Sequence, residues 1–414
     1  MINPATGREF ASSDVPASSG SAEKTGRFIV EFRKETSPNE MLSALRDAGL
    51  SNVASSLDFD RQAIAAEQIE GADATVLSEI QFAFTDNDPS RAQGITAFAE
   101  TDDRIIAVVP EYVQSIRSTE TPVMEADVFQ DTDEFTWGLI ATQTNTSPFL
   151  GEGIKLTVLD TGFTTQHPDF AGRSVTTHSF IANESAEDGH GHGTHCVGTS
   201  SGPQNPPAGP RYGIAGSVEI YAGKVLGNSG SGSDGTVLAG INWAVANRSE
   251  VISMSLGADV PEVSPVYTDA GRRALNAGSL IIAAAGNNAN RPSDAGFVGT
   301  PANSPYIAAV GALDHSLDPT FFSARSGSGR GGQVDIAAPG LKVYSSWTLP
   351  NQYNVISGTS MATPHVAGIA ALWAEATGLR GAALWSVLMQ EAQRLFAPSV
   401  DVGSGLARAP QGRD

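Results

Sequence analysis

The chain has 414 residues, of which 40% are hydrophobic and 17% are charged, and this composition predicts a large folded core rather than a disordered polypeptide. Its formal net charge of −20 argues against nucleic acid and anionic membranes as partners, because both bind basic surfaces. No run of about 18 apolar residues occurs, so we expect no membrane insertion.

Residues 1–26 predict a disordered segment that is rich in Ser, Ala, Pro and Gly. The segment lacks the apolar stretch of a secretory signal peptide. The protein therefore either stays inside the cell, which we favour, or is secreted by a route that needs no such signal, or is numbered without its leader.

Residues 27–116 predict a small α+β domain. Strand-like stretches are expected at 27–32, 80–84 and 105–109, and helix-like stretches at 38–49 and 94–100. No residue in this part carries chemistry, so a generic binding module also fits the pattern.

Residues 117–134 predict an exposed acidic linker, in which Arg117 is the only basic residue. In residues 135–414, apolar strands alternate with helical stretches, and this alternation predicts a parallel sheet covered on both faces. The strands are expected at 154–160, 218–225, 251–256, 280–285 and 306–312, and the helices at 192–201, 234–247, 266–277 and within 363–395.

Two motifs in this larger domain supply an acid and an imidazole. Residues 154–162 read Ile-Lys-Leu-Thr-Val-Leu-Asp-Thr-Gly, so Asp160 ends an apolar strand and precedes a turn. Residues 188–199 read Asp-Gly-His-Gly-His-Gly-Thr-His-Cys-Val-Gly-Thr, and His192 lies at a glycine-rich helix start.

A third motif supplies a hydroxyl. Residues 358–368 read Gly-Thr-Ser-Met-Ala-Thr-Pro-His-Val-Ala-Gly, which places Ser360 where a strand turns into a long helix. We interpret Pro364 as a proline of the first helical turn. A lone serine at a helix start is usually only an N-cap. Together, however, the three motifs supply the groups of a catalytic triad in the chain order Asp, His, Ser.

On these motifs the chain resembles the subtilisin-like serine proteases over about residues 135–410. The resemblance implies a three-layer α/β fold with a mostly parallel central sheet. It makes residues 27–116 similar to the small α+β, ferredoxin-like pro-domain that helps these enzymes to fold and then inhibits them. It further implies a zymogen that cuts itself in the linker, acts on protein or peptide substrates and needs no cofactor for catalysis.

The resemblance also assigns catalytic roles. Ser360 is the nucleophile, and its hydroxyl needs a base within hydrogen-bond reach. His192 is that base, and Asp160 holds the imidazole in the correct tautomer. Asn287, at the end of the apolar run 281–287, is the side-chain donor of the oxyanion hole, and the N–H of Ser360 is the backbone donor.

Two other histidines compete with His192 for the role of base. In the family's His-Gly-Thr-His run the first histidine is catalytic and the second is buried, so the resemblance favours His192 and makes His195 a packed helix residue. His190 is then an exposed loop residue. Cys196, the only cysteine, follows in the same helix and is either a small buried hydrophobe or a reactive thiol.

Two segments match those that sandwich an extended peptide in the family, where main-chain hydrogen bonds give affinity. Their residues are Gly230, Ser231, Gly232, Ser255, Leu256 and Gly257. The glycine-rich segment also fits a plain surface loop. Gly299 matches the floor of the pocket for the residue before the scissile bond. No acidic residue aligns there, although Asp294 lies in the same loop, so we expect an uncharged pocket that prefers large apolar side chains.

Asp169 matches a residue that binds structural calcium in many subtilisins, and we expect either such a site or a plain surface turn. Calcium needs about six to eight oxygen ligands, and the sequence does not identify the others. The complete set of catalytic groups favours an active endopeptidase over a catalytically dead binding protein. An esterase or peptide ligase that uses the same acyl-enzyme chemistry is a further alternative.

Overall fold

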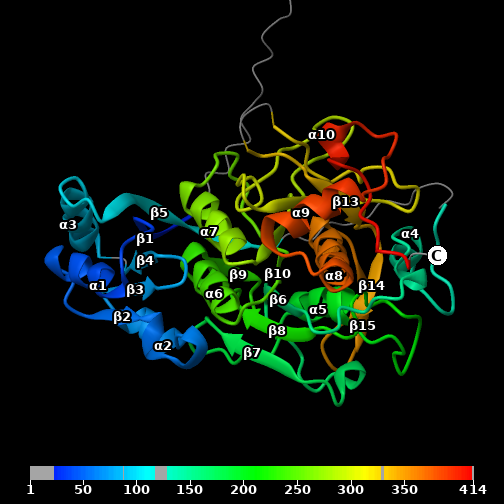
Figure 1. Ribbon diagram of the computed structural model, residues 1–414, viewed down its shortest axis with the longest axis horizontal. Coiled ribbons are helices and arrows are strands. Elements are labelled where there is room, and N and C mark those ends of the chain that lie inside the picture. The colour runs from blue at the N-terminus through cyan, green and yellow to red at the C-terminus, as the bar shows by residue number, and fades with distance from the viewer. Residues whose placement is uncertain (1–22, 87, 117–127, 328–330, 413–414) are drawn as a thin grey trace, which may run out of the picture.

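The structure, a computed structural model, describes residues 23–86, 88–116, 128–327 and 331–412. These residues form a smaller N-terminal unit and a larger unit that lie side by side (Figure 1). Most of the predicted N-terminal segment, and residues 117–127 of the predicted linker, lie outside the described residues.

The smaller unit combines a twisted antiparallel sheet with helices. Its elements are β1 (Lys24–Phe32), α1 (Pro38–Asp47), β2 (Val53–Ser55), α2 (Ala66–Gly71), β3 (Ala74–Leu77), β4 (Phe82–Thr85), α3 (Pro89–Ala99) and β5 (Ile105–Ser115). The strand order is β2-β3-β4-β1-β5, and only the β2–β3 pair is parallel. Helix α1 begins with a capping box, because Ser37 and Glu40 each accept a hydrogen bond from the other's backbone N–H.

Successive residues of β1 serve two different cores, because side chains alternate across a strand. Val30 and Phe32 pack under the helices of the smaller unit, in a core that also holds Met41 and Leu45. Ile29 faces the other way, into a core shared with the larger unit. The smaller unit therefore has an apolar centre of its own and a second apolar face that the larger unit covers.

The larger unit alternates strands and helices as the sequence predicts. Its elements are α4 (Trp137–Ala141), β6 (Lys155–Asp160), β7 (Val175–Ser179), α5 (His192–Ser201), β8 (Glu219–Lys224), β9 (Ser231–Ser233), α6 (Asp234–Ala246), β10 (Val251–Met254), α7 (Pro265–Asn276), β11 (Leu280–Ala284), β12 (Ala308–Leu313), β13 (Ile336–Pro339), β14 (Val343–Ser346), β15 (Tyr353–Ile356), α8 (Thr359–Thr377), α9 (Gly381–Gln390) and α10 (Ser399–Val402).

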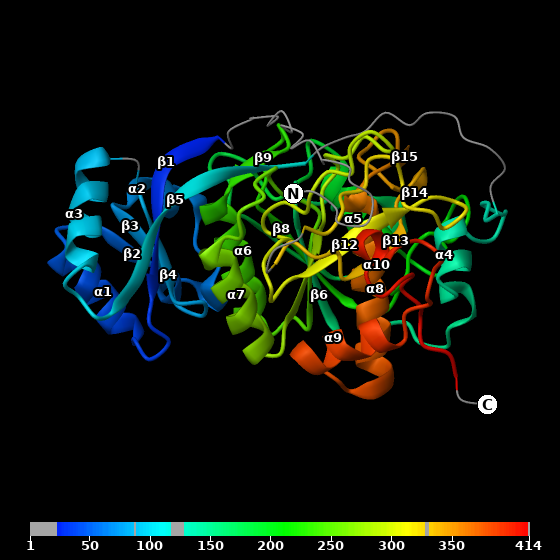
Figure 2. The ribbon, with the colours of Figure 1, turned by 90° about the horizontal axis from the view of Figure 1, so that it is seen from above.

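Seven strands form a parallel sheet in the order β13-β12-β11-β10-β6-β8-β7. Helices α5 and α8 pack on one face, and α6 and α7 pack on the other (Figures 1 and 2). Neighbouring residues of one strand enter opposite cores, as Val158 and Leu159 do. A strand at the centre of the sheet is therefore mostly apolar, and β11 appears in the sequence as a continuous hydrophobic run.

Helices α6 and α7 lie between the two sheets, so each helix is covered on both sides (Figure 2). Strand β5 leaves the smaller unit and pairs antiparallel with β9 of the larger one. Its end reaches the carboxyl edge of the parallel sheet, where α/β sheets place their binding sites.

Candidate active site

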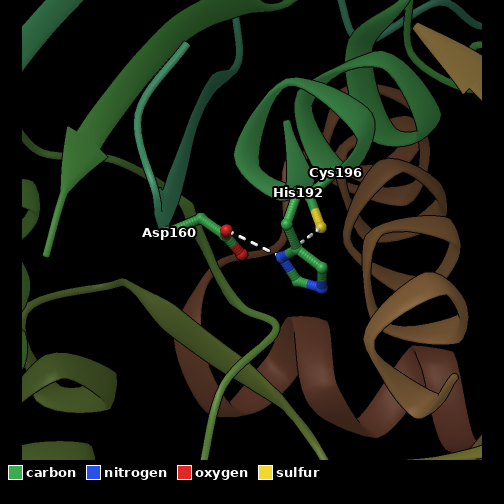
Figure 3. A group of neighbouring side chains, drawn as sticks. All are labelled: Asp160, His192 and Cys196. Carbon is green, nitrogen blue, oxygen red and sulfur yellow. Dashed lines mark hydrogen bonds and ion pairs between the residues drawn. The ribbon is translucent and has the colours of Figure 1, made fainter. Parts of the chain in front are cut away.

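Asp160 and His192 form a buried pair at the carboxyl edge of the sheet (Figure 3). Asp160 is the last residue of β6, and His192 is the first residue of α5. The Nδ1 atom of His192 lies 2.8 Å from Oδ1 of Asp160. This bond holds the imidazole by one nitrogen and leaves Nε2 for proton transfer.

The loop before α5 is organised by Asp188, which the sequence analysis did not single out. One of its carboxylate oxygens accepts from the N–H groups of His190 and Gly191, and the other accepts from the N–H and hydroxyl of Thr194. Gly191 has φ of 108°, and a Cβ there would lie 2.3 Å from the ring of Trp347. Only glycine fits this position, and His192 enters the helix at a fixed place.

The environments of the three histidines differ in ways that separate their roles. Burial lowers the pKa of His192, but the carboxylate of Asp160 outweighs it, and the pKa lies well above 6.5. His195 is fully buried with Nε2 3.0 Å from the carbonyl of Val343, and burial lowers its pKa to about 3. Burial also lowers the pKa of His190, which is half-buried rather than exposed.

Ser360 is the second residue of α8, and its backbone is tied to β10. Helix α8 begins at Thr359, so Pro364 lies in the second turn and our first-turn interpretation is wrong. A proline has no N–H, so the carbonyl of Ser360, four residues earlier, lacks its helical donor. The hydroxyl of Ser255 donates to that carbonyl at 2.7 Å, and the hydroxyl of Ser360 donates to the carbonyl of Ser255 at 3.2 Å.

Asn287 follows β11 and lies against the start of α8. Its Oδ1 accepts from the N–H of Thr359 at 2.9 Å and from the Thr359 hydroxyl at 2.8 Å. A Cβ added to Gly358 would lie 3.1 Å from Nδ2 of Asn287. The amide group therefore presents its donor nitrogen at the turn that leads into Ser360.

The two predicted peptide-binding segments enclose the protein's own residues 113–116. Strand β5 pairs with β9, so that Gln114 faces Gly232. Ser115 exchanges two backbone hydrogen bonds with Gly257, at 3.0 and 3.1 Å. The N–H of Ile116 donates to the carbonyl of Gly230 at 3.2 Å. The end of β5 thus lies as a middle strand between the two segments.

A pocket opens beside Ser360 under this strand. The residues that line it are Ser115, Leu256, Gly257, Ala258, Asp259, Ala284, Ala285, Gly286, Asn287, Gly299, Thr300, Thr359 and Ser360. Gly299 lies in the lining as predicted from the sequence, and a Cβ there would lie 2.4 Å from the carbonyl of Ala258. The expectation of an uncharged pocket is wrong, because Asp259 is part of the lining. Asp294 is exposed and is not among these residues.

Asp169 does not fit the predicted calcium ligand. Its Oδ1 accepts from the hydroxyl of Tyr353 at 2.8 Å, and its Oδ2 accepts from the hydroxyl of Tyr212. Both tyrosines lie in one aromatic cluster with His167 and Tyr344. Calcium requires about six to eight oxygen ligands, whereas both oxygens of Asp169 already accept a hydrogen bond from a tyrosine hydroxyl. The residues around Asp169 therefore form a hydrogen-bonded aromatic cluster.

Cys196 lies next to the buried pair of Asp160 and His192 (Figure 3). Its Sγ is 3.8 Å from Nδ1 of His192 and 3.7 Å from the carbonyl of Ser360. Ligand atoms of Asp160, His192 and Cys196 lie within 4.8 Å of one another, close enough to hold a soft metal ion. Burial raises the pKa of the thiol, so the residue behaves as a small buried group rather than as a thiolate.

The larger unit matches the subtilase family over residues 151–406, which is more than half of the chain. The chain therefore belongs to this family and is a subtilisin-like serine peptidase that acts on peptide bonds. Among the described residues, every helix is too short or too polar to span a bilayer.

Comparison with individual proteins gives the same class. The chain is 41% identical to Subtilisin Savinase of Lederbergia lenta over 240 residues, which are 57% of this chain and 82% of that protein. It is 39% identical to Subtilisin DY of Bacillus licheniformis over 225 residues, or 54% and 77% of the two chains. The crystal structure of a cold adapted subtilisin-like serine proteinase matches with a TM-score of 0.55 and 33% identity, over 64% of this chain and 92% of that one. These similarities confirm the predicted α/β fold and protease class.

Proposed function

We propose that the protein is a serine endopeptidase in which Asp160, His192 and Ser360 act as a triad. The observation that carries the proposal is the buried bond between Asp160 and His192 at the sheet edge where α8 presents Ser360. A raised imidazole pKa suits a general base, because it increases the affinity of Nε2 for the serine proton.

The reaction proceeds in two halves. In the first, Oγ of Ser360 attacks the scissile carbonyl carbon while Nε2 of His192 takes the hydroxyl proton. The carbonyl oxygen becomes an oxyanion, which accepts hydrogen bonds from Nδ2 of Asn287 and from the N–H of Ser360, a group without a helical partner at this position. His192 then gives the proton to the leaving amine, and an acyl-enzyme remains. In the second half, water repeats the sequence on the acyl group and releases the acid.

The protein is made as a self-inhibited zymogen in which residues 27–116 are the pro-domain. The support for this role is the position of residues 113–116, which occupy both peptide-binding segments in the manner of a substrate strand. The scissile bond lies between Ile116 and Phe135, and the cut pro-domain stays bound as a product-like inhibitor.

Polar contacts support a specific interface between the two units. The Glu111 carboxylate accepts from the N–H of Gly235 at 2.6 Å, at the start of α6, and pairs with Arg27. Arg273 of α7 donates to the carbonyls of Ile80 and Phe32, both at 2.7 Å. These contacts satisfy polar groups that would otherwise be buried without partners, so they favour one docking geometry over a nonspecific hydrophobic contact.

The pocket beside Ser360 selects the side chain before the scissile bond. Its backbone-lined walls and Gly299 leave room for a long side chain, which supports the large residue expected from the sequence. The lining also contains Asp259, whose charge affects which long side chain fits best.

The triad is tested by reacting the purified protein with a fluorophosphonate and mapping the labelled peptide. Labelling of Ser360 that is lost in His192→Ala is the expected result, because the hydroxyl is unreactive without its base. His195→Ala is the matched control, since His195 bonds to Val343 and not to Asp160. Equal loss of labelling in a folded His195→Ala protein would contradict the assignment.

A further inference from the structure

We propose that the enzyme prefers arginine or lysine before the scissile bond. This inference rests on the proposed endopeptidase function and names its substrate class. It is carried by two observations: the presence of Asp259 in the lining of the pocket, and the register of residues 113–116 in the cleft.

Asp259 is the only charged residue among the described residues that line the pocket. The other lining groups are backbone, small side chains, hydroxyls, one leucine and one amide. Asp259 is half-buried, so its charge is only partly screened by water. A pocket with such walls and one carboxylate offers an apolar path to a long side chain and a counter-charge for a cationic tip.

The carboxylate of Asp259 has a polar partner in the loop that follows β11. Nδ2 of Asn288 lies 3.3 Å from Oδ1 of Asp259. Asn288 is itself fixed, because its amide donates to the carbonyl of Phe297 and accepts from the Phe297 N–H. The contact links the loop after β10 to the loop that leads to Gly299. Asp259 is thus a built part of the pocket and not a surface side chain.

The register of the bound strand selects the residue that enters the pocket. Ser115 lines the pocket and Ile116 does not; Ile116 lies instead against Gly230, where a Cβ would be 3.0 Å from its side chain. Side chains alternate along an extended strand, so a substrate that continues past the position of Ile116 places its next side chain on the face of Ser115. The sequence has Arg117 at that position, and this residue lies outside the described ones.

Sequence and pocket therefore agree on a cationic residue. Arginine pairs with a carboxylate through two parallel N–H donors, and lysine supplies a point charge. A phenylalanine fits the walls but brings no charge to Asp259 and reduces the carboxylate's hydration. Because a hydrogen bond to a charged group contributes about 1.5–3 kcal/mol, we expect a preference for arginine over phenylalanine of about ten- to a hundredfold in kcat/KM.

The test uses p-nitroanilides of the series Gln-Ser-Ile-X, which copies residues 114–116 and varies the last residue as Arg, Lys, Gln or Phe. Rates are divided by the concentration of active sites found by fluorophosphonate titration. In wild type, Arg and Lys should exceed Gln and Phe. Asp259→Asn should lower the ratio of kcat/KM for Arg to kcat/KM for Phe by about ten- to a hundredfold. Asp259→Glu should retain the preference for Arg.

The matched control is Asp294→Asn, which removes an exposed carboxylate from the neighbouring loop. It should leave the ratio of Arg to Phe at the wild-type value. A wild-type preference for Phe, or equal ratios in Asp259→Asn and Asp294→Asn, would overturn the inference while leaving the endopeptidase function intact. Failure of every substrate together with an unlabelled Ser360 would instead overturn the proposed function.

Self-processing gives a second readout on the full chain. Sequencing the new N-terminus of the larger fragment should show Ser118 as its first residue. Arg117→Gln should slow the release of that fragment. A first cut at another bond of the linker, at the same rate in wild type and Arg117→Gln, would contradict the proposed register.

Discussion

A pair of carboxyl groups at the interface of the two units predicts that the smaller unit binds the larger one more weakly as the pH rises. Glu31 of β1 lies 3.8 Å from the guanidinium of Arg273, which also contacts Asp269 at 3.3 Å. Burial, and then the hydrogen bond and charge of Asp269, raise the pKa of Glu31 to about 8, although Arg273 and Arg272 oppose the rise. Between pH 4.5 and about 8, Glu31 therefore carries a proton in the complex and loses it when the units separate.

Glu31 in the separated smaller unit has its ordinary pKa near 4.5, so protonated Glu31 contributes its full binding free energy below that pH. Between pH 4.5 and about 8 this contribution decreases, and above pH 8 it is absent. The full rise from 4.5 to about 8 would be worth about 5 kcal/mol. Solvent screening at an interface reduces it, and we expect about ten- to a hundredfold weaker binding at pH 8.5 than at pH 5.

The assay titrates mature enzyme, blocked at Ser360 by a fluorophosphonate, with a separately produced fragment of residues 23–117 and follows heat release from pH 5 to pH 8.5. Glu31→Gln should flatten the pH dependence, whereas Glu35→Gln, at an exposed position, should not change it. Some pH dependence of binding should remain in Glu31→Gln, because burial also raises the pKa of Asp234 to about 7. The carboxylate of Asp234 accepts hydrogen bonds from the N–H of Tyr112 and the side chain of Gln114. Binding that is equal at both pH values in wild type, or that strengthens with pH, would refute the reasoning.

Three further predictions concern the larger unit. The carboxylate of Asp160 raises the pKa of His192, so kcat/KM should fall as the pH decreases through a midpoint above 6.5. Asp160→Asn should move this midpoint to lower pH. Profiles of kcat/KM against pH for both proteins check this, and an unchanged midpoint would contradict it. Because tyrosine hydroxyls occupy the oxygens of Asp169, the effect of calcium on Tm should be the same in Asp169→Asn as in wild type. Tyr353→Phe should lower the stability by about 1–2 kcal/mol relative to Tyr344→Phe, measured by denaturant unfolding.

The sequence predicts the central sheet well because its strands are buried on both faces. Strand β11 stands out as an unbroken apolar run and β6 as a mostly apolar one, since each face of the sheet packs under a helix layer. Strand β7 is half-buried along its whole length and reads Val-Thr-Thr-His-Ser, so hydrophobicity does not reveal it. Strand β13 is short and reads Ile-Ala-Ala-Pro, in which small residues give too weak a signal.

The parts of the site that escaped prediction depend on tertiary contacts. Asp259 lines the pocket because the loop after β10 contacts the loop after β11. The two loops are far apart in the sequence, so the sequence alone does not show this contact. Asp169 matches a calcium ligand by its local motif, but its partners come from Tyr212 and Tyr353, far along the chain. The sequence predicts Pro364 in the first turn of the helix, but α8 begins at Thr359, where Asn287 contacts its first residue, and Pro364 lies in the second turn.

We propose that Ser360, activated by His192, cuts peptide bonds and that its first substrate is this chain. Intact-mass analysis of freshly purified wild type and Ser360→Ala distinguishes self-cleavage from cleavage by another protease. We expect two fragments from wild type, separated after Arg117, and a single uncut chain of 414 residues from Ser360→Ala. The same fragments from both proteins, at equal rates, would contradict the claim.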